Sequence, residues 1–596
     1  MSQAGPHLAS PNGQERRNHT LYGLAVFVVV LAAVVLRFAA LDHYPLPVHQ
    51  DELSDIYDGY SLAMTGTDRA GARWPFIVRG VGPGDYHPAL QVYLTAISTS
   101  LCGFSVWAGR LPAAVLGTVA VILIFLFARR LLGRSGGLIA LVFATFSPVL
   151  IQFGRQAHPG ACLPPFFTIL IVYLLYRAID RQQDEPQSRT SLVWLAGAGL
   201  AVGLSTSGYA AQRITGLLFA LAGAGLILWQ VGYQQRRPAR SGVMLLVLAV
   251  ATGMGAFPQI HAMLAQPADF FARGRTVSYD WQAGPRWWAA RVLEGYAAHF
   301  HPRLLFFSFG QYGELTVARL SVAAFPLLYV GIAVAAYRSI HRRQPGLVLL
   351  LCGIMISILP AVVSKSNLAI LRVSGVWSLY PILSALGAVS LDRAVRRRRV
   401  AHARSNRQRL LIPQMDRGAV LATAALAVVV GGLGIHNIVR YLARPDWHGT
   451  VYQNHLVRIG EWVADNGGDY QRVYVDTPGV FVHLYMAAFS GMSPSRFQRA
   501  PREGYVTPHG WEKFNRFGRF HFADKVQAES DWAASARNES WLYINADGET
   551  AVFLPDGLTA QAGVPAASPR PSMTTPLQAS RRRLRPMGMD GTCGMD

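Results

Sequence analysis

A series of apolar stretches, each long enough to cross a bilayer, constrains this chain more than any other feature of its sequence. A helix needs roughly 20 apolar residues to span the hydrocarbon core. With 51% hydrophobic and only 15% charged residues among 596, the chain is too apolar for a soluble protein of this length. We therefore predict a polytopic α-helical membrane protein. The spans are expected near 21–40, 105–128, 136–153, 163–179, 191–207, 212–232, 241–258, 319–337, 345–363, 372–391 and 418–438.

Arginine clusters between these spans predict the orientation of the chain. Lys and Arg outnumber Asp and Glu by 55 to 33. Because this excess lies in short segments between apolar spans, it indicates cytoplasmic loops and disfavours a nucleic-acid partner. With about 11 spans, the N-terminus is expected inside and the C-terminus outside. The basic segments are 129–134, 177–189, 236–240, 338–343 and 393–409.

A further apolar segment, 88–102, is short and contains Gln91 and Tyr93. If it crossed the membrane, every later basic segment would face outward, against the positive-inside rule. We therefore predict a juxtamembrane helix here. The long polar loops 41–104 and 259–318 then face outward and are expected to carry the chemistry.

The sequence also predicts how the rest of the chain is organised. Residues 1–20 form a cytoplasmic tail, and 21–440 form the transmembrane domain. Residues 446–556 mix helical and strand patterns and predict a small extracytoplasmic α/β domain. The segment 557–596 is rich in Pro, Ser and Arg, which is typical of disorder.

The acidic pair Asp51-Glu52 follows the first span directly, in a dense polar stretch. Acidic groups beside a bilayer are costly and commonly mark a site. A carboxylate there could act as a general base toward a hydroxyl. Alternatively, the pair is solvated or forms a salt bridge to Arg73 or Arg79.

Carboxylate and imidazole groups elsewhere in the outer loops are candidate metal ligands. Asp85, His87 and His261 could together hold a divalent cation. They come from distant loops and make no metal motif by spacing. The alternative is an interfacial histidine and a helix-capping aspartate.

Cationic groups at the outer ends of spans are candidate anion-binding residues. Arg155 and His158 lie in a short loop, Lys365 lies before the tenth span, and Arg372 opens that span. Arg binds phosphate as a bidentate donor, but each Arg could instead snorkel to the interface.

The largest outer loop adds Arg273 and Arg275 with several Trp residues. Together they suit either stacking on a sugar or an interfacial aromatic belt. The Trp residues are Trp281, Trp287 and Trp288.

Several segments, in this order, resemble the bacterial protein-mannosyltransferase-like (family 39) membrane glycosyltransferases, which are related to the lipid A aminoarabinose transferases. The resemblance covers about residues 21–440. It is carried by His49-Gln50-Asp51-Glu52, Ala63-Met64-Thr65-Gly66, His87-Pro88-Ala89-Leu90, Gly103-Phe104-Ser105 through Arg110-Leu111-Pro112 to Ala128-Arg129-Arg130, Pro258 to His261, Gln266-Pro267-Ala268-Asp269, and Asn367 to Arg372 with Gly375 and Pro381.

The resemblance implies a GT-C architecture and a reaction in the inner or plasma membrane. A sugar would move from a polyprenyl-phosphate donor to an acceptor hydroxyl on the extracytoplasmic face, with inversion and without a nucleotide cofactor. The acceptor could be a glycan, a lipid or a protein. Asp51 would be the catalytic base and Glu52 its neighbour, while Arg372 and His87 would hold the lipid phosphate. A divalent cation would bridge Asp85 or His87 to His261.

One departure and two rival functions stay open. Many family members carry an Asp in the second outer loop, where this chain has His158-Pro159-Gly160. Asp55 or Asp58 could take over its role. A transporter or flippase for lipid-linked glycans predicts internal repeats and charges at mid-span, which the sequence does not contain. A polymerase or ligase would differ only in its donor.

Overall fold

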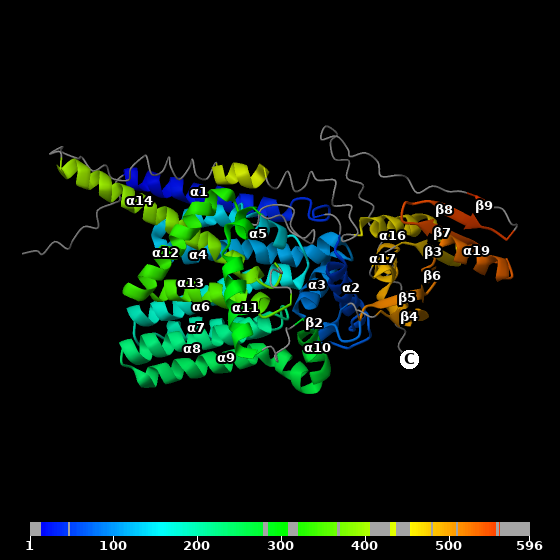
Figure 1. Cartoon of the computed structure of the whole chain (residues 1–596), viewed down its shortest axis with the longest axis horizontal. Helices are drawn as coiled ribbons and strands as arrows, with labels where there is room; N and C mark the ends of the chain where they lie inside the picture. Colours follow the sequence, from blue (N-terminus) through cyan, green and yellow to red (C-terminus); the bar gives the residue numbers. More distant parts are fainter. Residues whose placement is uncertain are drawn as a thin grey trace, which may run out of the picture.

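Long apolar helices form one end of the molecule and an α/β unit forms the other (Figure 1). The computed structural model describes residues 13–45, 48–80, 82–277, 284–307, 320–365, 370–405, 429–436, 453–477, 479, 481–507, 510–555 and 559–560. The predicted tail 557–596 therefore lies almost wholly outside the described residues. So do most of the last predicted span, 418–438, and the segment 308–319 of the predicted loop 259–318.

The helices of the first 405 residues follow the predicted spans closely. They are α1 (Gly13–Phe38), α2 (Gln50–Thr65), α3 (Leu90–Cys102), α4 (Val106–Thr145), α5 (Pro148–Phe153), α6 (Pro159–Asp184), α7 (Arg189–Ser205), α8 (Gln212–Ile227), η1 (Leu228–Gln234), α9 (Pro238–Ala265), α10 (Pro267–Val277), α11 (Gly284–His299), η2 (Arg303–Phe307), η3 (Val322–Ala324), α12 (Phe325–His341), α13 (Pro345–Val362), η4 (Ser374–Ser378) and α14 (Tyr380–Ser405). In the described part of the chain, 8 helices are long and apolar enough to cross a membrane.

One of these eight, α4, covers the predicted span 105–128 and the first part of the span 136–153, which continues into α5. Gly133 has φ 85° and ψ −175°, so the helix is broken there. A Cβ on Gly137 would lie 2.7 Å from the Cβ of Arg129. Residues eight apart in a continuous helix are about 12 Å apart along its axis, so the chain must reverse at Gly133. The predicted spans 105–128 and 136–153 are therefore separate helices on either side of Gly133, as the sequence predicts. The total of about 11 spans stays a prediction.

The segment predicted to lie along the membrane is the short helix α3. Its 13 residues reach only about 20 Å at 1.5 Å per residue, which is too little to cross the hydrocarbon core. A two-stranded antiparallel sheet of β1 (Ile77–Arg79) and β2 (Tyr86–Pro88) precedes it. This sheet fixes the start of α3 and the position of His87, which pairs with Val78.

The C-terminal unit, defined as the described residues between 453 and 560, has a seven-stranded mixed sheet in the order β4-β5-β6-β3-β7-β8-β9. The central strand β3 is parallel to both of its neighbours. Its elements are α16 (Asn454–Asn466), β3 (Arg472–Asp476), α17 (Val482–Phe489), α18 (Pro494–Arg499), β4 (Arg502–Val506), β5 (Glu512–Phe517), β6 (Phe520–His521), α19 (Lys525–Ala534), β7 (Trp541–Asn545), β8 (Thr550–Phe553) and β9 (Thr559–Ala560).

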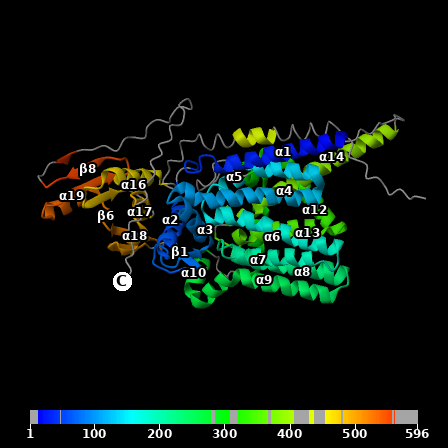
Figure 2. The ribbon, with the colours of Figure 1, turned by 180° about the vertical axis from the view of Figure 1, so that it is seen from behind.

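Helix α2 lies between the two ends of the molecule, which both views make plain (Figures 1 and 2). Its apolar residues Leu53, Ile56 and Tyr57 belong to the same buried cluster as residues of α16 and α17. Helix α2, which carries several acidic residues, is therefore buried between the membrane helices and the C-terminal unit.

Candidate functional site

Helix α2 carries four carboxylates within its first nine residues: Asp51, Glu52, Asp55 and Asp58. His49 caps the start of this helix, because its Nδ1 accepts a hydrogen bond from the backbone N–H of Asp51. Free N–H groups give the first turn a partial positive charge, which favours acidic side chains there. The four carboxylates meet different partners, and those partners decide what each can do.

Glu52 forms a buried ion pair with Arg110 of α4. Both carboxylate oxygens are occupied, at 2.7 Å from Arg110 Nε and 2.9 Å from Nη2. Oε1 also accepts the backbone N–H of Ala157 at 2.7 Å. Burial alone would raise the pKa of Glu52, but Arg110 and the Ala157 amide lower it below its usual value. Glu52, expected beside the base in the pocket, instead joins α2 to α4 and to the loop that contains Ala157.

Asp51 is nearly half exposed, with 45% of its side chain accessible. Its Oδ2 lies 3.7 Å from His158 Nε2 and 3.8 Å from His49 Nδ1. His158 caps α6, and its Nδ1 accepts the Gly160 N–H, so its Nε2 carries a proton that faces Asp51. Partial burial would raise the pKa of Asp51, but the surrounding histidines hold it well below its usual range.

Asp55 lies one helical turn after Asp51 and is 1% exposed. Its Oδ1 is 2.8 Å from Nε2 of His87. Its Oδ2 is buried without a hydrogen-bond partner, which is uncommon in folded proteins. Burial would lower the pKa of His87, but Asp55 and the nearby Asp85 raise it above its usual value.

Asp58 is fully engaged by Arg69 and is not available to a substrate. Arg69 donates to it from Nη1 at 2.7 Å and from its backbone N–H at 2.9 Å. Arg69 also bonds the backbone oxygens of Arg79 and Gly80. Of the two acids considered as a replacement for the missing second-loop Asp, Asp55 therefore has the free oxygen.

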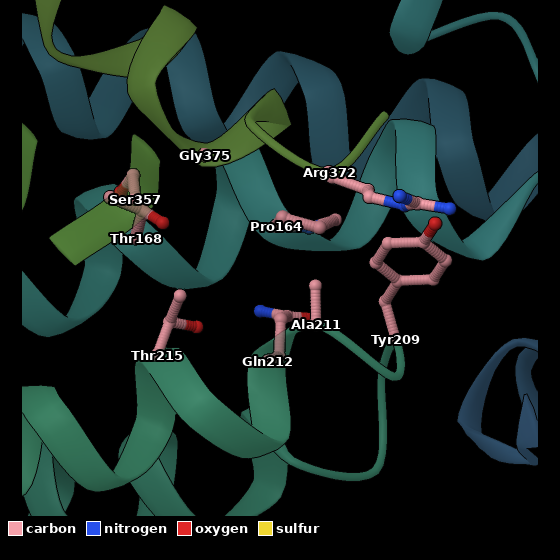
Figure 3. Close-up of a pocket in the computed structure, with 9 residues that line it drawn as sticks. All are labelled: Pro164, Thr168, Tyr209, Ala211, Gln212, Thr215, Ser357, Arg372 and Gly375. Atoms are coloured by element: carbon pink, nitrogen blue, oxygen red, sulfur yellow. The ribbon is translucent and has the colours of Figure 1, made fainter. Parts of the chain in front are cut away.

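Arg372 lies at one end of a polar cavity between α6, α8 and α13 (Figure 3). The cavity is lined by Pro164, Thr168, Tyr209, Ala211, Gln212, Thr215, Ser357, Arg372 and Gly375. The Arg372 guanidinium donates to the hydroxyls of Ser364 and Tyr209. Oε1 of Gln212 and Oγ of Ser357 are buried without hydrogen-bond partners, so the cavity offers unsatisfied polar groups.

Tyr209 connects this cavity to Asp51. Its ring lies 6.3 Å from the ring of His158, measured between centroids. Its hydroxyl points at Arg372 (Figure 3). Asp51, His158, Tyr209 and Arg372 thus form a continuous row from the start of α2 to the cavity, although Asp51 is not one of the residues that line it.

The other predicted anion-binding residues lie in different settings. Arg155 donates four hydrogen bonds, to the backbone oxygens of Leu36, Ala39, Ala40 and Tyr44, and so closes the C-terminal end of α1. Arg273 contacts Asp85 at 3.2 Å and acts electrostatically on Arg372.

Lys365 follows Ser364, the partner of Arg372, and its backbone N–H bonds the oxygen of Val277. Arg275 lies in the last turn of α10, and Trp287 and Trp288 lie in α11. Asn367 and Trp281 lie outside the described residues.

The three predicted metal ligands do not come together. Asp85 contacts Arg273, and His87 contacts Asp55. His261 packs against the rings of Phe76 and Phe257. Within the described ranges, no group of three or more His, Cys, Asp or Glu could hold a metal ion. The residues present do not fit the cation that the family resemblance implies.

Two residues of the site were missed by reasoning from the sequence. Arg110 lies in one of the segments that carry the family resemblance. A charged residue inside an apolar stretch commonly marks a functional site, so this charge could have identified it. Tyr209 gave no signal, because a tyrosine after an apolar span is ordinary.

Comparisons with known proteins show which fold the chain has. Residues 86–255 match the family model described as dolichyl-phosphate-mannose-protein mannosyltransferase. The chain is 27% identical over 117 residues to YkcB of Bacillus subtilis (strain 168), provisionally named a mannosyltransferase. That match covers 20% of this chain and 15% of YkcB.

ArnT of Cupriavidus metallidurans, solved bound to undecaprenyl phosphate, matches with a TM-score of 0.52 and 14% identity, over 87% of this chain and 92% of ArnT. The apo oligosaccharyltransferase of Archaeoglobus fulgidus matches with a TM-score of 0.45 and 14% identity, over 79% of this chain and 64% of that protein. The resemblance to GT-C membrane glycosyltransferases is confirmed, and so is the fold. The family model does not reach Asp51, Arg372 or the C-terminal unit.

Proposed function

We propose that this protein is a membrane glycosyltransferase that moves a sugar from a polyprenyl-phosphate donor to an acceptor hydroxyl. The row Asp51, His158, Tyr209 and Arg372 carries this proposal. It joins a half-exposed carboxylate to an arginine at the edge of a polar cavity, so a base and a phosphate-binding group lie at opposite ends of one row.

In this mechanism Arg372 binds the donor phosphate. Its guanidinium can give two parallel N–H donors to phosphate oxygens. The hydroxyls of Thr168 and Ser357 line the same cavity and can donate to further oxygens. A site with arginine and several hydroxyls therefore suits a phosphate better than an uncharged headgroup.

Asp51 then accepts the proton of the acceptor hydroxyl. The acceptor oxygen forms a bond to the anomeric carbon as the bond from that carbon to the phosphate oxygen breaks, and polyprenyl phosphate leaves with its electron pair. A single displacement inverts the anomeric carbon. A carboxylate of low pKa is a weak base, so proton transfer is expected late, when the attacking hydroxyl has become acidic.

Asp55 is the second carboxylate of this site in the proposal, in place of the Asp missing from the second outer loop. Its free Oδ2 can accept a hydrogen bond from a sugar hydroxyl once the donor is bound. We assign the site to the extracytoplasmic face, because α2 lies at the opposite end of the helices from the arginine-rich end of α14 (Figure 1).

The proposal predicts that Arg372→Ala slows donor turnover roughly 10- to 100-fold, since a hydrogen bond to a charged group contributes about 1.5–3 kcal/mol. The full chain in lipid nanodiscs is given undecaprenyl-phosphate mannose, glucose, galactose or arabinose with a bacterial envelope extract as acceptor. Release of undecaprenyl phosphate is followed by mass spectrometry.

The matched control is Arg342→Ala, an exposed arginine in the loop after α12, which should turn over like the wild type. If the wild type consumed none of the four donors, this result would contradict the proposed function. If Arg372→Ala and the wild type turned over the donor equally fast, Arg372 would not be the residue that binds the donor phosphate.

A further inference from the structure

We propose that the C-terminal unit is a positioning clamp for the first turn of α2, and that Tyr485 and Gln453 are its positioning residues. The consequence for catalysis rests on the proposed role of Asp51. The clamp itself is a statement about contacts between two parts of the chain that lie more than 400 positions apart.

Two hydrogen bonds from the C-terminal unit hold the residues just before Asp51. The Tyr485 hydroxyl donates to the backbone oxygen of Val48 at 2.6 Å, in a buried setting. Gln453 Nε2 donates to Gln50 Oε1 at 3.0 Å, and Gln453 is itself 3% exposed. The residues on the N-terminal side of Asp51 are thus held from outside the membrane domain.

Further contacts join the C-terminal unit to later turns of α2 and lie outside the clamp on the first turn. The Tyr57 hydroxyl donates to the backbone oxygen of Met492 at 2.9 Å. The Gln498 amide lies within 2.8–3.3 Å of four acceptors beyond the end of the second turn. Those acceptors are Ser61 Oγ, Thr65 Oγ1, Thr67 Oγ1 and the backbone oxygen of Asp68.

The first turn of a helix is the part that most needs such support. Its N–H groups have no partners within the helix, and its residues fray unless they are capped or packed. Arg110 holds Glu52 from the membrane side, and Tyr485 holds Val48 from the other side. Asp51 lies between these two anchors, and a displacement of about 1 Å at a reacting group can cost a factor of 100 in rate.

Hydrogen exchange of the full chain in nanodiscs tests the clamp without any substrate. Tyr485→Phe removes the bond to Val48 but keeps the ring. Tyr57→Phe is the matched control, because it removes one tyrosine bond of similar length two turns further along α2. We expect amides in a peptide covering residues 48–56 to exchange at least fivefold faster in Tyr485→Phe than in Tyr57→Phe. Equal exchange in the two variants would overturn the clamp.

Donor turnover then separates positioning from simple loss of stability. Tyr485→Phe should lower kcat about 5- to 10-fold with an unchanged KM for the donor, while Tyr57→Phe should keep both within twofold. Equal kcat in Tyr485→Phe and the wild type would refute the catalytic consequence. Full activity of Asp51→Asn would instead refute the proposed function and leave the exchange result standing.

Discussion

Asp51 and Glu52 are adjacent acids with opposite surroundings. Asp51 is 45% exposed and surrounded by histidines, whereas Glu52 is 1% exposed and paired with Arg110. The sequence predicts both as site residues because it places them in one polar stretch after the first span. It could not separate them, because the partner of Glu52 lies 58 positions along the chain.

The Glu52–Arg110 pair predicts a large loss of stability when one partner is removed. Glu52→Gln should lower the free energy of unfolding by about 3–5 kcal/mol, because a buried arginine would keep its charge without a matching carboxylate. Equilibrium unfolding in mixed SDS micelles measures the change.

The double variant Glu52→Gln/Arg110→Met serves as the control for this prediction. It removes both charges and should recover much of the loss. A Glu52→Gln protein as stable as the wild type would show that the pair does not hold α2 to α4.

At the scale of elements, the most predictable features were the helices in the membrane part. Their length and apolar character follow from the bilayer, and the basic segment at 129–134 marks the reversal at Gly133. Interactions between elements were less predictable. Arg155 closes the end of α1 through four backbone oxygens, which reasoning from the loop sequence alone could not distinguish from a phosphate site.

Helix α17 brings a histidine into the core of the C-terminal unit, and this predicts acid sensitivity. His483 packs against the rings of Phe514 and Phe517, and burial and nearby arginines lower its pKa to about 3. The unfolded chain binds a proton near pH 6.5 and the folded chain does not, so stability is full above that pH and falls below it. At pH 5 the expected loss relative to neutral pH is about 2 kcal/mol.

Hydrogen exchange of β3 and β7, corrected for the intrinsic pH dependence of exchange, measures this loss. His483→Phe should reduce the dependence on pH, and His43→Gln, an exposed histidine, should leave it unchanged. The explanation is wrong if His483→Phe and the wild type lose stability equally on acidification.

At the scale of the whole molecule, the fold and the membrane class could be predicted because spans, basic loops and ordered motifs all agree. The row from Asp51 to Arg372 could be predicted only at its ends. Its middle member Tyr209 and the unpartnered oxygen of Asp55 depend on how distant helices pack. The contact of the C-terminal unit with α2 was not predicted, because it joins segments about 400 positions apart through a few hydrogen bonds.

If Asp51 is the base, removing its charge should abolish most turnover, while removing a nearby exposed acid should not. Donor turnover is measured for Asp51→Asn and for Asp42→Asn, which changes an exposed acid nine positions earlier, between α1 and α2. We expect a loss of at least roughly 100-fold in kcat for Asp51→Asn, within the range of general-base catalysis. We also expect wild-type turnover for Asp42→Asn and unchanged binding of undecaprenyl phosphate by both variants. Full turnover by Asp51→Asn would contradict the role of Asp51 as base.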